Sequence, residues 1–253
     1  MKKNINKYNY KTIYGLNNSI NLLKRYNEYK IESIIINKES SILKDKELYF
    51  FLAKTKLKIN YLSKDDFNKK WNYKHTQGIV INFNGKLSKN IVEISTFSAN
   101  SCFVIVDQIN DPQNLGQIIR TSECAGIDGI ILPKHGSVHI TNSVLQVSQG
   151  AFFNTNIFIE TNLSNTIKYL KSKGFWIFGV ENSIKADNWY SMDYKGKSVI
   201  IIGSEGKGIR SLIKKSCDFL ATIPMKGKIN SLNVSAALSA VLFERQRQLD
   251  LVK

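Results

Sequence analysis

The sequence has few of the residues that build disulfide frameworks or metal centres. Its 253 residues include only three cysteines and three histidines. Cys102, Cys124 and Cys217 are odd in number, far apart and without a CxxC pair, which argues against a disulfide framework and a cysteine zinc site and fits a reducing compartment. His135 and His139 form an HxxxH pair with no third ligand type nearby, so we predict no metal site.

Long apolar runs are also missing. Residues 1–11 are basic, but they lack the stretch of about 7 to 15 apolar residues that a secretory signal needs. No run approaches the roughly 18 apolar residues that cross a bilayer. We therefore expect a cytoplasmic protein with no membrane segment.

Acidic residues are outnumbered: 36 Lys and Arg against 20 Asp and Glu give a net charge of +16. This excess favours a polyanionic partner such as nucleic acid or an anionic membrane surface. Codon bias that inflates Lys, Asn and Ile explains it as well, and composition leaves both explanations open. Hydrophobic residues make up 43% of the chain and aromatic residues 11%, which excludes disorder as the overall description.

The length predicts up to two domains at about 150 residues each. Residues 1–84 are predicted to form a small α/β module. In residues 85–97, Gly85, Ser88, Asn90 and Ser95 break any strong periodicity, which predicts a linker that can hold a short strand. The elements expected in the module are helices near Leu16 to Tyr29 and Asp45 to Lys56, and strands at Ser33 to Ile36 and Gly78 to Phe83.

Residues 98–253 alternate apolar strands with helices, a pattern typical of a parallel sheet covered on both faces. Ligands of such a sheet bind beyond the carboxyl ends of its strands. A final helix, Leu232 to Leu249, should pack inward through five apolar residues at helical spacing: Val234, Ala237, Leu238, Val241 and Leu242. The other expected elements are strands at Phe103 to Val106, Gly129 to Leu132, near Ile157, Trp176 to Val180, Val199 to Ile202 and Leu220 to Ile223, and helices at Asn114 to Ala125, Ser143 to Gly150 and Ser164 to Lys173.

The first segment that carries chemistry, residues 107–121, is a polar loop that leaves a strand and opens a helix. Asn114 and Arg120 lie nearly two helical turns apart, so they share a site only if Asn114 caps the helix and Arg120 points back toward it. The structural alternative is a turn at Asp111-Pro112, an N-cap at Asn114 and a surface cation at Arg120.

The second segment, residues 201–209, is a glycine-rich turn after a buried strand. Its glycines let the backbone approach a ligand, but the spacing fits neither a dinucleotide fingerprint nor a phosphate-binding P-loop. Glu205 would repel phosphate and suits a cationic or hydroxyl-bearing ligand, unless it is a solvated residue of an ordinary turn. In the third segment, residues 223–235, Ser231 and Asn233 can cap the last helix or face a ligand.

Together the three segments resemble the signatures of the SpoU class of ribose 2′-O-methyltransferases, knotted enzymes that use S-adenosylmethionine. The resemblance covers Cys102 to Glu244. The signatures read Asn-Asp-Pro-Gln-Asn-Leu-Gly-Gln-Ile-Ile-Arg-Thr, Ile-Gly-Ser-Glu-Gly-Lys-Gly-Ile and Ile-Pro-Met-Lys-Gly-Lys-Ile-Asn-Ser-Leu-Asn-Val-Ser. More weakly, the N-terminal module is similar to the ribosomal-protein-like substrate domain of bacterial 23S rRNA guanosine 2′-O-methyltransferases, through Ile13-Tyr14-Gly15-Leu16 and Gln77-Gly78-Ile79-Val80.

The resemblance implies an α/β parallel-sheet domain with a trefoil knot, a homodimer and no metal. It also implies S-adenosylmethionine-dependent methylation of a ribose 2′-hydroxyl in 23S rRNA, on a guanosine. The methyl donor would be held by Gly203, Ile223 and Leu232, with Met225 nearby. The catalytic set carried over is Asn114, Arg120, Glu205, Ser231 and Asn233.

Because a guanidinium is effectively never deprotonated in proteins, we expect Arg120 to orient the target and stabilise the developing alkoxide rather than act as the base. Glu205 would orient Arg120. Two alternatives stay open: the same chemistry on tRNA, and a catalytically inactive RNA-binding factor for ribosome assembly. The N-terminal module argues against the first, and the intact catalytic set argues against the second.

Overall fold

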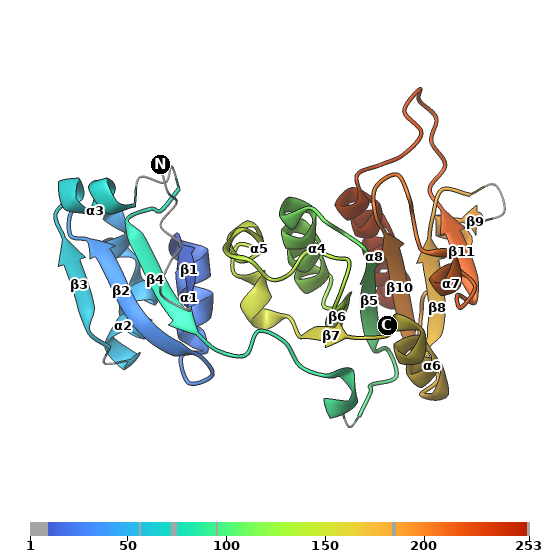
Figure 1. Cartoon of the computed structure of the whole chain (residues 1–253), viewed down its shortest axis with the longest axis horizontal. Coiled ribbons are helices and arrows are strands. Elements are labelled where there is room, and N and C mark those ends of the chain that lie inside the picture. Colours follow the sequence, from blue (N-terminus) through green and yellow to red (C-terminus); the bar gives the residue numbers. More distant parts are fainter. Residues whose placement is uncertain (1–9, 56, 72–74, 95, 184–185, 252–253) are drawn as a thin grey trace. The chain divides into compact units, whose positions relative to one another are not determined.

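The computed structural model describes residues 10–55, 57–71, 75–94, 96–183 and 186–251 (Figure 1). The chain forms two compact units. Unit 1 consists of residues 1–86 and 141–154, and unit 2 consists of residues 87–140 and 155–253. The chain therefore passes between the units three times. The expected limits of the domains, at residues 84 and 98, stay a prediction.

Unit 1 is built on a four-stranded mixed sheet in the order β1-β4-β2-β3. β4 is antiparallel to both neighbours, while β2 and β3 are parallel. The strands are β1 (Lys11–Tyr14), β2 (Lys30–Asn37), β3 (Ile59–Leu62) and β4 (Ile79–Asn84), and the helices are α1 (Leu16–Lys24), α2 (Lys46–Thr55), α3 (Lys64–Lys70) and α5 (Asn142–Val147).

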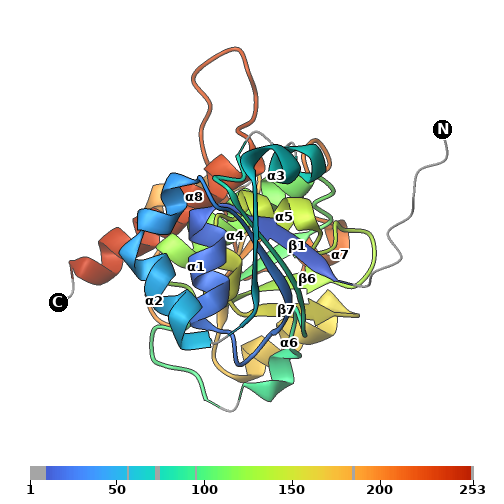
Figure 2. The same ribbon diagram turned by 90° about the vertical axis from the view of Figure 1, so that its left-hand side faces the viewer.

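The sheet of unit 1 has helices on both faces. Phe67 of α3 packs against Ile35 and Val80, which face each other across β2 and β4. Successive strand residues point to opposite faces, so Ile34 and Ile81 face away from α3. Helices α1 and α2 lie side by side (Figure 2). The end expected for the second helix, Lys56, lies outside the described residues.

The two short motifs of unit 1 meet at the start of α1. Gly15 adopts a φ of 85°, which favours glycine, and its N–H donates to the carbonyl of Ile79 over 3.3 Å. The side chain of Gln77 accepts a hydrogen bond of 2.7 Å from the N–H of Leu16. Gln77 therefore satisfies a free amide of the first helical turn, a task that usually falls to the N-cap residue.

Helix α5 covers the outer edge of β1. The Asn142 side chain accepts from the N–H of Thr12 over 3.2 Å. Gln146, one turn later, accepts from the N–H of Tyr14 over 3.2 Å and donates to the Tyr14 carbonyl over 3.1 Å. Residues two apart on a strand and four apart on a helix are similarly spaced, at about 6 to 7 Å. Two side chains thus replace a missing neighbouring strand and protect an exposed edge.

The rest of residues 141–154 is also held within unit 1. Phe153 is fully buried and makes edge contacts with the rings of Tyr29 and Phe83. Its carbonyl accepts from the Arg25 guanidinium, and Asn154 donates to Asn21 over 3.0 Å. The helix expected at Ser143 to Gly150 is shorter than predicted and is followed by a 3-10 turn, Ala151–Asn154.

Unit 2 is a seven-stranded sheet in the order β7-β6-β5-β10-β8-β11-β9, parallel throughout. This confirms the expected α/β parallel-sheet architecture. The strands are β5 (Cys102–Asp107), β6 (Gly129–Pro133), β7 (Ile157–Glu160), β8 (Trp176–Val180), β9 (Asp187–Asn188), β10 (Ser198–Gly203) and β11 (Phe219–Thr222), and the helices are α4 (Pro112–Cys124), α6 (Leu163–Ser172), α7 (Ser211–Lys214) and α8 (Val234–Asp250).

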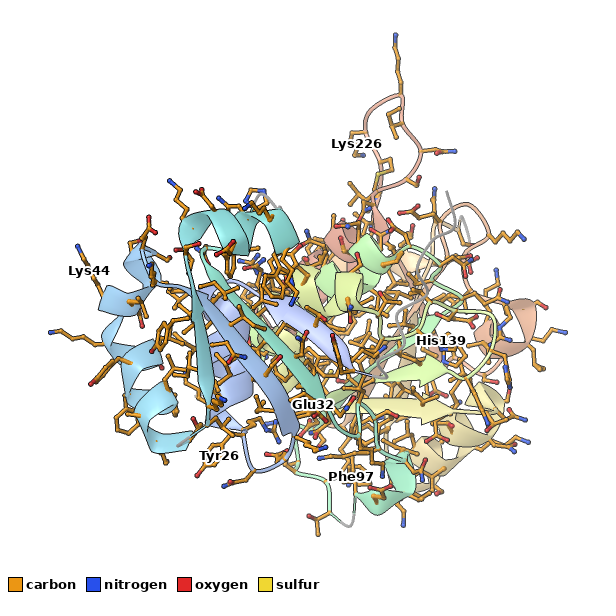
Figure 3. The ribbon with its side chains drawn as sticks, turned by 60° about the vertical axis from the view of Figure 1, so that its left-hand side comes forward. Tyr26, Glu32, Lys44, Phe97, His139 and Lys226 are labelled. Carbon is orange, nitrogen blue, oxygen red and sulfur yellow. The ribbon has the colours of Figure 1, made fainter. Side chains whose placement is uncertain are left out.

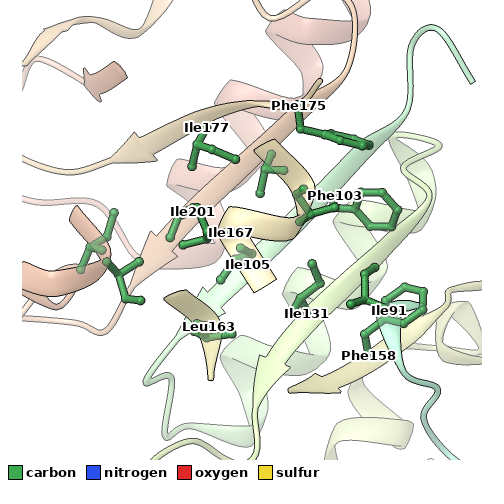
Figure 4. Packing of buried hydrophobic residues seen from close by; sticks show 14 residues of the cluster. Ile91, Phe103, Ile105, Ile131, Phe158, Leu163, Ile167, Phe175, Ile177 and Ile201 are labelled. Atoms are coloured by element: carbon green, nitrogen blue, oxygen red, sulfur yellow. The ribbon is translucent and has the colours of Figure 1, made fainter. Parts of the chain in front are cut away.

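The central strands β5, β6 and β10 are buried along their whole length, as a parallel sheet covered on both faces requires. On one face, Phe103 and Ile105 pack with Leu163 and Ile167 of α6 (Figure 4). Val104 and Val106 point to the opposite face, where α4 and α8 pack together. In α8, four of the five apolar residues expected to face inward are buried, namely Val234, Leu238, Val241 and Leu242. The fifth, Ala237, is only half-buried.

Residues 85–97 are partly integrated into unit 2. A 3-10 turn, Ile91–Glu93, lies within the expected linker, and Ile91 joins the core cluster beside Phe158. The backbone of Lys89 pairs with that of Phe158 in a parallel bridge. An apolar residue in a polar, glycine-containing stretch is a weak sequence signal, although its burial holds the stretch to the sheet.

The α5 side chains give a testable consequence. In the double variant N142A/Q146A, the amides of Thr12 and Tyr14 lose their acceptors, so we expect their hydrogen exchange to speed up by roughly 2- to 10-fold each. Exchange measured by NMR on the full chain checks this. Ser143→Ala, at an exposed position of the same helix, is the matched control. Unchanged exchange in the double variant would show that α5 does not protect the edge of β1.

Candidate functional site

A cavity of about 360 Å³ lies at the carboxyl ends of β8, β10 and β11, where a parallel sheet binds its ligands. The loop after β11, residues 223–233, forms one wall and stands out from the sheet with Lys226 on it (Figure 3). The first turns of α8 complete the lining through Val234 and Ala237. The remaining lining residues are Val180, Glu181, Asn182, Ile202, Gly203, Ser204, Glu205, Gly206, Lys207, Gly208, Ile223, Met225, Asn230, Ser231 and Leu232.

The floor of the cavity is a turn that folds back on itself after β10. The N–H of Gly208 donates to the Ser204 carbonyl over 2.9 Å, and the N–H of Ser204 donates to the Gly208 carbonyl over 3.2 Å. A Cβ on Gly203 would lie 2.1 Å from the carbonyl carbon of Gly208, so no larger residue fits there. Gly208 itself has a φ of 66°, which favours glycine.

An ion pair between a buried carboxylate and a partly exposed guanidinium holds this turn against the neighbouring strand. Asp107, fully buried at the end of β5, accepts from the backbone N–H of Arg210 over 2.9 Å and from its Nε over 2.8 Å. The Arg210 Nη2 lies 2.7 Å from Asp107 Oδ1. Asp107 is also the residue that faces Gly203 in the β5–β10 pairing. The carboxylate therefore fixes the distance between the first and second signature segments.

Three side chains from the three signature segments form one hydrogen-bonded cluster. Asn114 Nδ2 donates to Glu205 Oε1 over 2.7 Å. Asn233 Nδ2 donates to Asn114 Oδ1 over 2.9 Å and to Glu205 Oε1 over 3.2 Å. A carboxylate oxygen that accepts from two amides fixes the rotamers of both. We call Asn114, Glu205 and Asn233 the amide–carboxylate cluster.

The ends of two helices position this cluster. The N-cap of α4 is Asp111, whose side chain accepts from the N–H of Gln113 over 2.9 Å, with Pro112 in the first turn. The expectation of an N-cap at Asn114 was wrong because Asp-Pro supplies the cap three residues earlier. Asn114 therefore lies within the first turn and is buried. Asn233 does cap α8, accepting from the N–H of Ser235 over 2.9 Å, while its other amide atom joins the cluster.

The sequence-derived site residues fall into two groups. The cavity is lined by all four residues expected to hold a methyl donor, Gly203, Ile223, Met225 and Leu232. Glu205 and Ser231, from the expected catalytic set, also line it. Arg120 is exposed on α4 and is not part of the lining. Within the described residues, no hydrogen bond or ion pair joins Arg120 to Glu205, so the expected orientation of Arg120 by Glu205 stays a prediction.

The cavity wall also contains residues that the sequence reasoning did not select. Glu181 and Asn182 follow β8 directly, and Asn182 Nδ2 donates to the Asn230 carbonyl of the 223–233 loop over 2.5 Å. Their position after a buried strand of a parallel sheet was the available signal. They belong to no glycine-rich or signature segment, so they were passed over.

Other chemistry in the described part of the chain is limited. No group of three His, Cys, Asp or Glu residues there is placed to hold a metal ion. None of the described helices has the length and hydropathy needed to cross a membrane. Burial raises the pKa of Cys217 to about 12, which keeps this thiol protonated and a poor nucleophile.

The Asp107–Arg210 pair gives a stability prediction. Asp107→Asn keeps the size of the side chain but removes its charge, so we expect the free energy of unfolding of the full chain to fall by about 2 kcal/mol. Urea unfolding checks this. Asp193→Asn is the matched control because Asp193 is 68% exposed in its pair with Lys195 and should contribute little. Equal midpoints for the two variants would show that the Asp107–Arg210 pair does not hold the turn.

Known proteins match somewhat more than half of the chain by sequence and most of the chain by fold. A Staphylococcus saprophyticus protein assigned by name to the TrmH family of tRNA/rRNA methyltransferases is 44% identical over 144 residues, 57% of each chain. The 23S rRNA (guanosine-2′-O-)-methyltransferase RlmB of Shewanella oneidensis is 43% identical over 145 residues, 57% of this chain and 58% of RlmB. These alignments span less than two thirds of either relative.

Solved structures show the same fold. The AdoMet-bound rRNA methyltransferase of Sinorhizobium meliloti superposes with a TM-score of 0.79 at 22% identity, over 95% of this chain and 88% of that one. The SpoU methyltransferase AviRb of Streptomyces viridochromogenes, in complex with AdoMet, gives 0.76 at 17% identity, over 95% and 91%. Residues 101–243, more than half of the chain, match the SpoU rRNA Methylase family. The chain is a member of that family.

Proposed function

We propose that this protein transfers a methyl group from S-adenosylmethionine to the 2′-hydroxyl of a ribose in 23S rRNA, on a guanosine. The observation that carries the proposal is that the second and third signature segments line one cavity, while the amide–carboxylate cluster joins the first segment to them through Asn114. Neither the RNA nor the nucleotide follows from the fold, so both rest on the likeness to RlmB and on unit 1.

The cavity residues fit S-adenosylmethionine. The volume of the cavity, about 360 Å³, lies in the usual range for small-molecule pockets. Ile223, Met225 and Leu232 offer an apolar wall for a purine, while the turn at Gly203 lets the backbone approach closely. When bound, S-adenosylmethionine supplies a methyl group activated by the positive charge on its sulfur.

The chain's own residues hold and polarise the target hydroxyl. Asn114 and Asn233, fixed through Glu205, and Ser231 in the cavity wall offer polar groups that position the ribose. Arg120 contacts the target phosphate and stabilises negative charge as it develops on the 2′-oxygen. The roles of these residues are proposals.

We further propose that two copies of the chain assemble the site. Arg120 is exposed and is not part of the cavity lining of its own chain. The Arg120 of one copy can therefore reach the amide–carboxylate cluster of the other copy. Helix α8 carries exposed apolar side chains suited to such an interface, among them Phe243, which is 50% exposed. The resemblance also implies that the C-terminal strand and helix pass through a loop to form a trefoil knot.

Unit 1 supports rRNA over tRNA as the substrate. The structures of the A. aeolicus TrmH/SpoU tRNA modifying enzyme and of an enzyme for methylation of C/U34 on tRNA cover only 66% and 60% of this chain. The rRNA methyltransferase of S. meliloti covers 95%. Residues 1–84 carry 17 basic and 7 acidic residues, which suits contacts to RNA phosphates.

Mapping of ribose methylation in cells with and without the protein tests the proposed substrate. We expect one 2′-O-methylguanosine of 23S rRNA to disappear on deletion, and to return with the natural chain but not with Arg120→Ala. Mass spectrometry of rRNA and tRNA fragments gives the measurement. Loss of a methyl group from tRNA alone would establish the tRNA alternative. Unchanged methylation in both, with a defect in ribosome assembly, would establish the inactive factor.

Arg120 gives a kinetic prediction. Arg120→Ala should slow methyl transfer by about 10²- to 10³-fold, because it removes a group that stabilises charge in the transition state, while leaving S-adenosylmethionine affinity nearly unchanged. Arg120→Lys should recover part of the rate, and Glu205→Gln should be milder than Arg120→Ala. Single-turnover transfer and calorimetry give the two quantities.

Lys168→Ala, at an exposed cation on α6, is the control for loss of surface charge. Normal turnover in Arg120→Ala would remove Arg120 from the mechanism and leave it as a surface cation of the helix.

A further inference from the structure

One carboxylate in the cavity wall is not explained by the amide–carboxylate cluster. Glu181 follows β8, and its backbone N–H continues the sheet by donating to the Ala221 carbonyl over 3.0 Å. Its side chain is 14% exposed. Oε1 accepts from the ammonium group of Lys214, whereas Oε2 is buried and has no hydrogen-bond partner among the residues that the structure describes.

A buried carboxylate oxygen without a donor is unfavourable, because it has lost its hydrogen bonds to water and gained none in exchange. The backbone of Gly208 lies over it, since a Cβ on Gly208 would be 3.5 Å from Glu181 Oε2. Gly208 belongs to the turn that forms the cavity floor. The unpartnered oxygen is therefore next to the turn that a bound ligand would contact.

The charge of the pair indicates which donor this oxygen takes. Lys214 compensates the charge of the Glu181 carboxylate, so the pair as a whole is neutral. A neutral pair gives little net attraction to a cation such as an ammonium group. A hydroxyl, which brings a donor without a charge, matches a charged acceptor that is already balanced, and its hydrogen bond to a carboxylate is strong.

The position of Glu181 separates it from the reacting groups. In the sheet, β10 lies between β5 and β8, and neighbouring strands are about 4.8 Å apart. Asn114 follows β5 and Glu205 follows β10, so the cluster lies toward one end of this row and Glu181 toward the other. If the methyl group of S-adenosylmethionine lies near the amide–carboxylate cluster, the ribose hydroxyls of the same molecule can reach a group at the end of β8, such as Glu181.

We propose that Glu181, held by Lys214, accepts a hydrogen bond from a ribose hydroxyl of the methyl donor through Oε2. Glu181 is thus a cofactor-binding residue, outside the three signature segments, that recognises the sugar. The inference rests on the proposed function. It also requires the Gly206-Lys207-Gly208 turn to shift or the Glu181 side chain to rotate when the ligand binds, because Oε2 is covered in the free protein.

The test measures binding of S-adenosylhomocysteine and of its 2′-deoxy and 3′-deoxy forms to the full chain by calorimetry. Glu181→Ala should lower the affinity for S-adenosylhomocysteine by about 10- to 100-fold, the range for the loss of one hydrogen bond to a charged group. The deoxy ligand that lacks the recognised hydroxyl cannot bond to Glu181. It should therefore bind the natural chain and the Glu181→Ala variant with the same reduced affinity. Thermal unfolding should show a folded variant, because the substitution removes an unsatisfied oxygen.

Glu160→Gln is the matched control. Glu160 ends strand β7 of the same sheet and is not part of the cavity lining, so its substitution should leave affinity unchanged. A natural chain that binds no S-adenosylhomocysteine would refute the proposed function itself. If the natural chain binds but Glu181→Ala binds equally well, only the role of Glu181 is overturned. An equal loss for all three ligands would assign Glu181 to another part of the donor, not to the ribose.

Discussion

The buried carboxylate of Asp107 is the contact on which the geometry of the site depends. It ends the central strand β5, and Arg210 binds it through both the backbone and the guanidinium. One carboxylate thereby connects the strand that leads into the Asn114 loop with the far end of the glycine turn. A charge this deeply buried is stable only when its hydrogen bonds are made, so the turn has little freedom to adopt another arrangement.

The amide–carboxylate cluster has a single charged group, the carboxylate of Glu205. Asn114 uses both amide atoms in the cluster, donating through Nδ2 to Glu205 and accepting through Oδ1 from Asn233. Because Asn233 also caps α8, the start of the last helix and the placement of one amide of the cluster are set by the same side chain. The capping and ligand-facing explanations of this residue are compatible.

The sequence predicted the central strands well because continuous apolar runs are unambiguous: the run Phe103 to Val106 lies within β5 and Val199 to Ile202 lies within β10. It missed β1 and β3, which have four residues each and little apolar alternation. The cavity residues came from motif resemblance, since no local pattern brings Ile223 and Gly203 together. Glu181 could not be found this way, because its significance depends on Lys214 and Gly208, which only tertiary structure places beside it.

Residues 141–154 belong to unit 1 although the residues before and after them belong to unit 2, which limits how the chain can be cut into independent fragments. This segment lies inside the stretch that matches the SpoU family, yet Phe153 packs between rings of unit 1. No single cut separates the units, because a fragment made by removing residues 1–86 would expose Phe153 and leave Gln146 without the strand edge it covers. Loss or exchange of the N-terminal module would therefore require matching changes in this segment.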